Sequence, residues 1–263
     1  MNRIEQKLLD LKKENKKAFI TYLTAGLPDM KTTEEILKAQ EEAGIDLVEI
    51  GIPFSDPIAD GPVIQQASFE AIQNGADLVG AFEMVQSFRK ESGLPLIFMM
   101  YYNTIYFYGV AEFVKKCAEI GVDGLIIPDL PFEEQEEIKK EIEKYDKTIL
   151  IQLVSPVSKD RLPMILEGAR GFVYCVSSMG VTGQGDGFHQ NLINYLKEVK
   201  EKSEIPIMMG FGIKEARDVE SVKDIIDGCI VGSHFIEILK DAGYAPEAAR
   251  VYVEKFQREL NAK

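Results

Sequence analysis

The sequence predicts one domain spanning residues 1–263, built as a closed α/β barrel of eight parallel strands that alternate with helices. A charged amphipathic segment, a Gly or Asp turn and a short apolar run recur along the chain. No Pro/Gly/Ser-rich linker interrupts this repeat, and 263 residues suit a single barrel. An open doubly wound sheet is the alternative, although such a sheet normally needs an edge strand or a switch point. We therefore expect a (β/α)8, or TIM, barrel.

Eight apolar runs are the candidate strands. They are largely continuous rather than strictly alternating, which is typical of parallel strands covered on both faces. Four stand alone, at 18–25, 94–101, 148–154 and 205–210, and four end the segments 41–52, 119–130, 166–178 and 222–233.

Helical patterns follow the strand candidates, as at 31–44, 131–145 and 214–226. A further amphipathic segment at residues 1–14 carries Ile4, Leu8 and Leu11 on one face. We expect it to form an extra N-terminal helix that closes the bottom of the barrel.

The charge and the apolar content indicate a cytosolic protein. A net charge of −13 argues against nucleic acid or an anionic membrane surface as a partner. The start of the chain has no continuous apolar core, so no secretory signal is expected. Residues 92–111 carry no charge, but Pro95 and Asn103 interrupt them, which favours a buried strand followed by a loop and a helix start.

The metal-binding residue types are sparse. Cys117, Cys175 and Cys229 lie far apart without a CxxC pair, so we expect buried thiols in a reducing compartment and neither disulfides nor a zinc site. His189 and His234 belong to no HExxH pattern and have no obvious pairing. The sequence therefore predicts no metal site.

Glu49 is the first candidate catalytic residue. Alternation in the strand places Val48, Ile50 and Ile52 against the helices and turns Glu49 into the barrel interior, near the catalytic end. A carboxylate there has its pKa raised by desolvation, which suits proton transfer near neutral pH. A structural glutamate paired with a buried cation or hydroxyl is the alternative.

The loop after this strand, at 53–61, carries two aspartates. Asp60 lies in Ala-Asp-Gly-Pro and Asp56 in Ser-Asp-Pro, and both contexts are typical of turns or helix caps. However, a long loop stiffened by proline above an interior glutamate is positioned like a lid. These aspartates therefore have either a catalytic role or a structural role in a turn.

Glycine clusters after the last strands predict an anion site. They are Gly180–Gly183 after the sixth strand, Gly210–Ile213 after the seventh, and Gly232 with Ser233 after the eighth. Barrels of this kind commonly hold phosphate at these loops, where glycine lets backbone amides approach the anion. Each glycine alone is an ordinary helix-entry turn, and Lys214 is either a neutralising charge or an exposed helix residue.

Taken together, these segments resemble the tryptophan synthase alpha family over essentially the whole chain. The most specific element is the run 47–62, LVEIGIPFSDPIADGP. The segments GVTG at 180–183, GFGI at 210–213 and GS at 232–233 agree with the family in order and position.

The resemblance implies retro-aldol cleavage of indole-3-glycerol phosphate to indole and glyceraldehyde 3-phosphate, with no cofactor in this chain. It implies that Glu49 is the general acid/base and that Asp60 binds the indole ring nitrogen. The implied substrate-binding residues, several of them around the phosphate, are Tyr22, Tyr101, Tyr174, Thr182, Gly183, Phe211, Gly212, Gly232 and Ser233.

The resemblance also implies a partner, a β subunit that uses pyridoxal phosphate and forms an α2β2 assembly. Loops 53–61 and 177–190 would form part of the contact, with exposed Pro53, Asp56 and Pro57 as candidate contact residues. Ser178 and Tyr22 depart from some relatives, which have arginine and phenylalanine there.

Two other functions remain open. One is a different phosphosugar barrel enzyme, although a synthase that closes the indole ring would be expected to use an interior strand lysine, which no strand candidate carries. The other is a mainly allosteric subunit that becomes active only with its β partner.

Overall fold

The computed structural model describes residues 1–176, 186–210 and 212–262, and within them nine parallel strands form one sheet. Its order is β5-β4-β3-β2-β1-β9-β8-β7-β6. The strands are β1 (Ala18–Thr24), β2 (Leu47–Gly51), β3 (Leu96–Met99), β4 (Gly124–Ile126), β5 (Ile149–Leu150), β6 (Gln152–Val154), β7 (Val173–Val176), β8 (Ile207–Gly210) and β9 (Gly228–Val231).

The sheet closes on itself at Ile151. β5 pairs with β4 and β6 pairs with β7, and only Ile151 separates β5 from β6 along the chain. The apolar run predicted as one strand over 148–154 therefore supplies both ends of the sheet. The predicted (β/α)8 barrel is confirmed, with its fifth strand divided into two short pieces.

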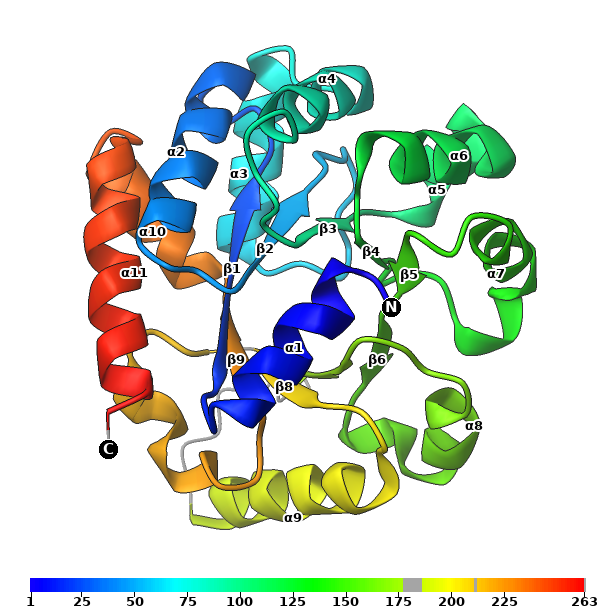
Figure 1. Ribbon diagram of the computed structural model, residues 1–263, viewed down its shortest axis with the longest axis vertical. Helices are drawn as coiled ribbons and strands as arrows, with labels where there is room; N and C mark the ends of the chain where they lie inside the picture. The colour runs from blue at the N-terminus through cyan, green and yellow to red at the C-terminus, as the bar shows by residue number, and fades with distance from the viewer. Residues whose placement is uncertain (177–185, 211, 263) are drawn as a thin grey trace.

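Helices surround the barrel on its outer side (Figure 1). The α-helices are α1 (Arg3–Lys13), α2 (Met30–Glu42), α3 (Pro62–Gln73), α4 (Leu78–Phe88), α5 (Tyr102–Tyr108), α6 (Val110–Ile120), α7 (Glu136–Glu143), α8 (Leu162–Leu166), α9 (Asp186–Lys202), α10 (Ser233–Asp241) and α11 (Pro246–Leu260), and the 3-10 helices are η1 (Phe132–Glu134), η2 (Pro156–Arg161) and η3 (Ala216–Val222).

The segment predicted as a helix over 214–226 forms the 3-10 helix η3 instead of an α-helix. Ala216, Val219 and Val222 are its buried residues, and they recur every three positions. This spacing matches three residues per turn rather than 3.6, which explains the tighter helix.

Alternation along β2 divides its side chains as predicted. Val48, Ile50 and Ile52 belong to the large apolar cluster between the sheet and the helices, whereas Leu47 belongs to the cluster inside the barrel. The buried members of the inner cluster that come from the strands and the residues beside them are Ala18, Ile20, Leu47, Ile97, Ile126, Ile149, Ile151, Phe172, Met208 and Ile230.

Helix α1 closes one end of the barrel, as predicted (Figure 1). Ile4 and Leu8 are buried in the inner cluster. Gly124 leaves room for this contact, because a Cβ atom there would lie 2.9 Å from Cδ1 of Ile4. The opposite end, at the C-terminal ends of the strands, is where barrel enzymes carry their chemistry.

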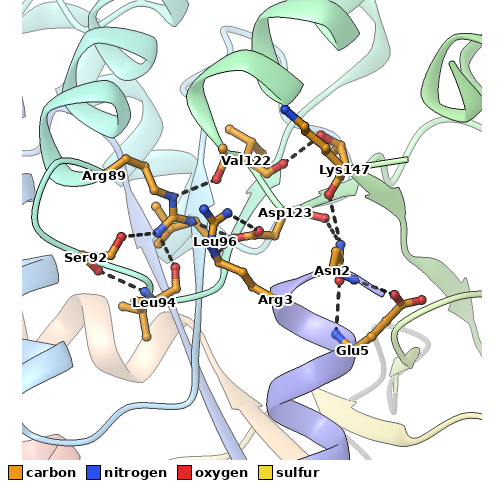
Figure 2. A network of polar contacts seen from close by, with 12 residues as sticks. Asn2, Arg3, Glu5, Arg89, Ser92, Leu94, Leu96, Val122, Asp123 and Lys147 are labelled. Atoms are coloured by element: carbon orange, nitrogen blue, oxygen red, sulfur yellow. Dashed lines mark hydrogen bonds and ion pairs between the residues drawn. The ribbon is translucent and has the colours of Figure 1, made fainter. Parts of the chain in front are cut away.

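A buried carboxylate fastens α1 to the barrel (Figure 2). Asp123 pairs with Arg3 of α1 at 2.8 Å and with Arg89 after α4 at 2.7 Å, and it accepts the Leu96 N–H at 2.9 Å. The Asn2 side chain donates to the carbonyl of Asp123 at 2.8 Å. The start of α1 is therefore tied to β3 and β4.

The predictions for the three cysteines and for the uncharged stretch 92–111 are confirmed. Cys117, Cys175 and Cys229 are buried free thiols. The uncharged stretch 92–111 contains β3 and the start of the following helices. In the part of the chain that the structure describes, no helix has the length and apolarity to cross a membrane.

Candidate active site

Glu49 lies inside the barrel on β2, with 1% of its surface exposed. Among the described residues, neither of its carboxylate oxygens has a hydrogen-bond partner. Burial therefore disfavours the charged form and raises the pKa of Glu49 to about 8. The alternative of a structural glutamate paired with a cation or hydroxyl finds no partner in the described part of the chain.

Two tyrosines line the same interior beside Glu49. Tyr22 on β1 is aligned with Glu49 in the β1–β2 register, and its ring lies over Gly51. A Cβ atom on Gly51 would lie 1.9 Å from the Tyr22 hydroxyl oxygen, so this ring position requires glycine at 51. Tyr174 on β7 lies over Gly210 in the same way, at 2.4 Å.

Both tyrosines are neutral phenols at ordinary pH. Burial is the main cause that raises the pKa of Tyr22 and of Tyr174, and the nearby carboxyl groups of Glu49 and Asp60 raise both further. The two tyrosine side chains beside Glu49 are therefore uncharged.

Asp60 lies in the β2 loop, which we define as residues 52–61 between β2 and α3. The Tyr101 hydroxyl donates to Oδ2 of Asp60 at 2.9 Å and accepts the Ala59 N–H at 2.9 Å. Burial raises the pKa of Asp60 to about 6, while the hydrogen bond from Tyr101 opposes that rise. The structure thus brings together Tyr101 and Asp60, which are 41 positions apart.

The β2 loop folds onto the barrel more closely than the sequence suggested. Asp56 is exposed, as predicted, but Pro53 and Pro57 are half-buried rather than exposed. The Asp60 N–H donates to the Pro57 carbonyl at 3.0 Å, which forms a turn within the loop, and the Ala59 N–H donates to the Tyr101 hydroxyl at 2.9 Å. The prediction that both prolines are exposed was therefore wrong.

The predicted anion site is described in part. Gly212 is exposed with a φ of +71°, a left-handed conformation that favours glycine. Gly232 precedes α10, whose first residue Ser233 is exposed, and no side chain caps the helix there. A helix N-terminus of this kind presents amide groups and a favourable dipole to an anion. Thr182, Gly183 and Phe211 lie outside the described residues.

Among the described residues, none of the other polar candidates forms a hydrogen bond with Glu49. Lys214 is exposed. His234 contacts Glu237 on α10 at 3.4 Å, and the side chain of His189 lies outside the described part. Within that part, no three His, Cys, Asp or Glu residues gather in a way that could hold a metal ion.

Sequence reasoning missed the residues that shape the β2 loop. Phe54 stacks on Tyr101 with ring centroids 5.0 Å apart, and Ser68 of α3 holds the Phe54 backbone. The one aromatic residue of the loop, Phe54, was the available signal. Gly51, inside an apolar strand, was a second signal, because a strand glycine often marks a close approach.

Residues 8–263 match the family model described as tryptophan synthase alpha chain. The chain belongs to this family. It is 66% identical to a tryptophan synthase alpha chain of Lachnospira eligens over 100% of both chains. A structure of tryptophan synthase subunit alpha from Legionella pneumophila shares 33% identity and a TM-score of 0.91 over 100% of both chains. A chain of M. tuberculosis tryptophan synthase shares 28% identity and a TM-score of 0.88, also over 100% of both chains.

As a tryptophan synthase alpha chain family member, the protein is a carbon–carbon lyase of tryptophan biosynthesis, and it cleaves indole-3-glycerol phosphate. This identification decides against a different phosphosugar barrel enzyme. Within the described site, Glu49 and Asp60 are the carboxyl groups whose pKa values are raised by burial.

Proposed function

We propose that Glu49 and Asp60 divide the cleavage of indole-3-glycerol phosphate between them. The observation that carries this proposal is the separation of their pKa values, about 8 for Glu49 and about 6 for Asp60. Near neutral pH Glu49 holds a proton that it can donate, whereas Asp60 is ionised and can accept a hydrogen bond. Two carboxyl groups whose environments separate their pKa values in this way are suited to different roles.

The steps follow from these protonation states. Glu49 donates its proton to C3 of the indole ring, and Asp60 stabilises the positive charge that develops on the ring nitrogen. The Glu49 carboxylate then removes the proton from the glycerol hydroxyl as the bond between C3 and the glycerol carbon breaks. The electron pair of that bond returns to the ring, which leaves indole, glyceraldehyde 3-phosphate and a protonated Glu49. These transfers need only the named side chains, so we propose no cofactor for this chain.

Substrate binding is proposed for the surrounding residues. The rings of Tyr22 and Tyr174 form walls of the indole pocket, and Tyr101 supports Asp60. The phosphate is proposed to bind at Gly212, Gly232 and the N-terminus of α10 at Ser233, where backbone amides favour an anion. Thr182, Gly183 and Phe211 complete the proposed set on the resemblance alone.

Steady-state cleavage of indole-3-glycerol phosphate tests the catalytic roles. We expect Glu49→Gln and Asp60→Asn each to lower kcat by about two orders of magnitude or more, the scale of general acid–base catalysis and of charge stabilisation. Glu254→Gln, on the exposed face of α11, is the matched control and should keep full activity. A fully active, folded Glu49→Gln enzyme would exclude the proposed role of Glu49.

A β subunit is the proposed partner. The M. tuberculosis neighbour is named as tryptophan synthase, and members of the alpha family pair with a β subunit. Ile58 in the β2 loop and Phe107 on α5 expose 84% and 92% of their surfaces at the catalytic end of the barrel. Exposed apolar side chains at one end of a molecule are typical of a protein contact.

We propose that the contact also includes Asp56 with the half-buried Pro53 and Pro57, in an α2β2 assembly whose β subunit carries pyridoxal phosphate. The proposed location is the cytoplasm, and the proposed domain is the whole chain 1–263. Assays with and without added β subunit separate an enzyme that is active alone from a subunit that needs its partner. Activity only in the presence of the β subunit would favour the second possibility.

A further inference from the structure

Tyr101 contacts the β2 loop near both of its ends. Its ring stacks on Phe54 with a centroid distance of 5.0 Å and an interplanar angle of 21°. Phe54 is itself fixed, because its N–H donates to Oγ of Ser68 at 2.8 Å and its carbonyl accepts the Ser68 hydroxyl at 2.9 Å. The start of the loop is therefore held between α3 and the ring of Tyr101.

The hydroxyl of Tyr101 holds the end of the loop. It accepts the Ala59 N–H at 2.9 Å and lies 2.9 Å from Oδ2 of Asp60. A backbone N–H can only donate, so the phenolic proton is free to point toward Asp60. The Ala59 amide thus sets the direction of the hydrogen bond, and a donated proton favours the ionised carboxylate.

We propose that Tyr101 is a positioning residue, which holds Asp60 through Oδ2 and leaves Oδ1 free to accept the ring N–H of the substrate. The proposal rests on the role proposed above for Asp60. Among the described residues the Asp60 side chain has this one hydrogen bond, so its orientation depends on the Tyr101 hydroxyl.

The other titratable groups that face Asp60 give it no cationic support. Tyr22 on β1 and Tyr174 on β7 interact with it electrostatically, and burial keeps both as neutral phenols. No lysine, arginine or histidine of the described chain forms an ion pair with Asp60, and Tyr101 is the one group that lowers its pKa. Loss of the Tyr101 hydroxyl therefore removes the interaction that keeps Asp60 ionised.

The test uses Tyr101→Phe, which keeps a ring to stack on Phe54 and removes only the hydroxyl. Tyr102→Phe is the matched control, because the Tyr102 hydroxyl donates to Glu137 at 3.0 Å on the outer surface. Two measurements are made on the full chain: the pKa of Asp60, from carboxyl 13C NMR assigned with Asp60→Asn, and kcat/KM for indole-3-glycerol phosphate between pH 5.5 and 8.

We expect the pKa of Asp60 to rise by about one unit in Tyr101→Phe, the scale of a hydrogen bond to a charged group. We expect kcat/KM to fall about fivefold at pH 6, because the ionised fraction of Asp60 falls from about a half to about a tenth, and to recover as the pH rises. Tyr102→Phe should leave both measurements unchanged.

An unchanged pKa of Asp60 in Tyr101→Phe would overturn the proposal. So would a loss of kcat/KM of the same size at every pH, because a purely structural effect on the loop would not depend on the ionisation of Asp60. The NMR measurement needs no turnover, so it decides the positioning role even if Asp60→Asn keeps full activity and the proposed catalytic role of Asp60 fails.

Discussion

Glu49 is buried without a hydrogen-bond partner in the described chain, and burial raises its pKa from 4.5 to about 8. Below pH 4.5 the group is protonated in both the folded and the unfolded protein. Between pH 4.5 and 8 the folded protein keeps a proton that the unfolded chain releases, so the free energy of unfolding falls as the pH rises. Above pH 8 the folded protein carries the full cost of a buried charge.

We therefore predict that Glu49→Gln is more stable than the wild-type protein at pH 8 by about 4 kcal/mol, because it cannot ionise and each unit of the pKa shift of Glu49 is worth about 1.4 kcal/mol. The difference should shrink toward zero near pH 4.5. Urea unfolding of both proteins at pH 5, 6.5 and 8 measures it. A stability difference that does not change with pH would contradict the pKa shift of Glu49.

The residue scale also shows what the sequence can and cannot reveal about the site. Alternation in β2 was enough to place Glu49 inside the barrel. Nothing local reveals that Tyr22 lies over Gly51 or that Tyr101 reaches Asp60, because these contacts join residues that are 29 and 41 positions apart. Such pairs are set by strand register and barrel curvature, which only the folded chain displays.

At the scale of elements, one buried carboxylate adds ion pairs to the apolar contacts that hold α1. Asp123 joins the mostly buried Arg89 to Arg3, whose side chain is nearly half exposed. Removal of one partner from a buried ion pair leaves an uncompensated charge, which costs far more than the loss of an exposed pair.

We predict that Asp123→Asn lowers the free energy of unfolding by about 3–5 kcal/mol, because it leaves the Arg89 charge buried without its partner. Arg3→Gln, the control at the exposed end of the same network, should cost about 1 kcal/mol or less. Urea unfolding measures both, and kcat of the folded variants should stay unchanged because the network lies at the end opposite Glu49. Equal losses of stability would show that the burial of Arg89 is not the decisive feature.

The existence of most strands and helices was predicted well from their apolar patterns, whereas the division of one strand and the type of one helix were not. The eight strand runs and the helix at 1–14 were recognised from their patterns. The run 148–154 gave no sign of its division at Ile151, because the closure of the barrel decides which neighbour each half pairs with. The segment 214–226 carried charges at helical spacing, but its buried residues have a period of three.

At the scale of the whole molecule, the two ends of the barrel serve different purposes. One end is closed by α1 and its ion pairs, whereas the other carries Glu49, Asp60 and the exposed Ile58 and Phe107. A partner that docks at the second end reaches the β2 loop directly. The partner contact proposed above therefore includes the loop that carries Asp60.

We predict that Phe107→Ser weakens binding of the β subunit about tenfold or more, because the buried centre of an interface draws its affinity from large aromatic side chains. Val251→Ser on α11, where Val251 is 54% exposed on the outer helical layer, is the control and should bind normally. Titration calorimetry with purified β subunit measures both, and cleavage by the isolated Phe107→Ser chain should be unchanged. Normal binding by Phe107→Ser would place the interface elsewhere.

The isolated carboxyl group of Glu49 has a consequence for how such a protein evolves. Because this buried carboxyl group destabilises the fold, selection for heat resistance alone would favour its replacement. A single nucleotide change is enough to replace glutamate by glutamine. Only continued demand for the product can keep the glutamate in place. Screens for more thermostable variants of this protein should therefore require growth without added tryptophan. Otherwise they will enrich inactive variants.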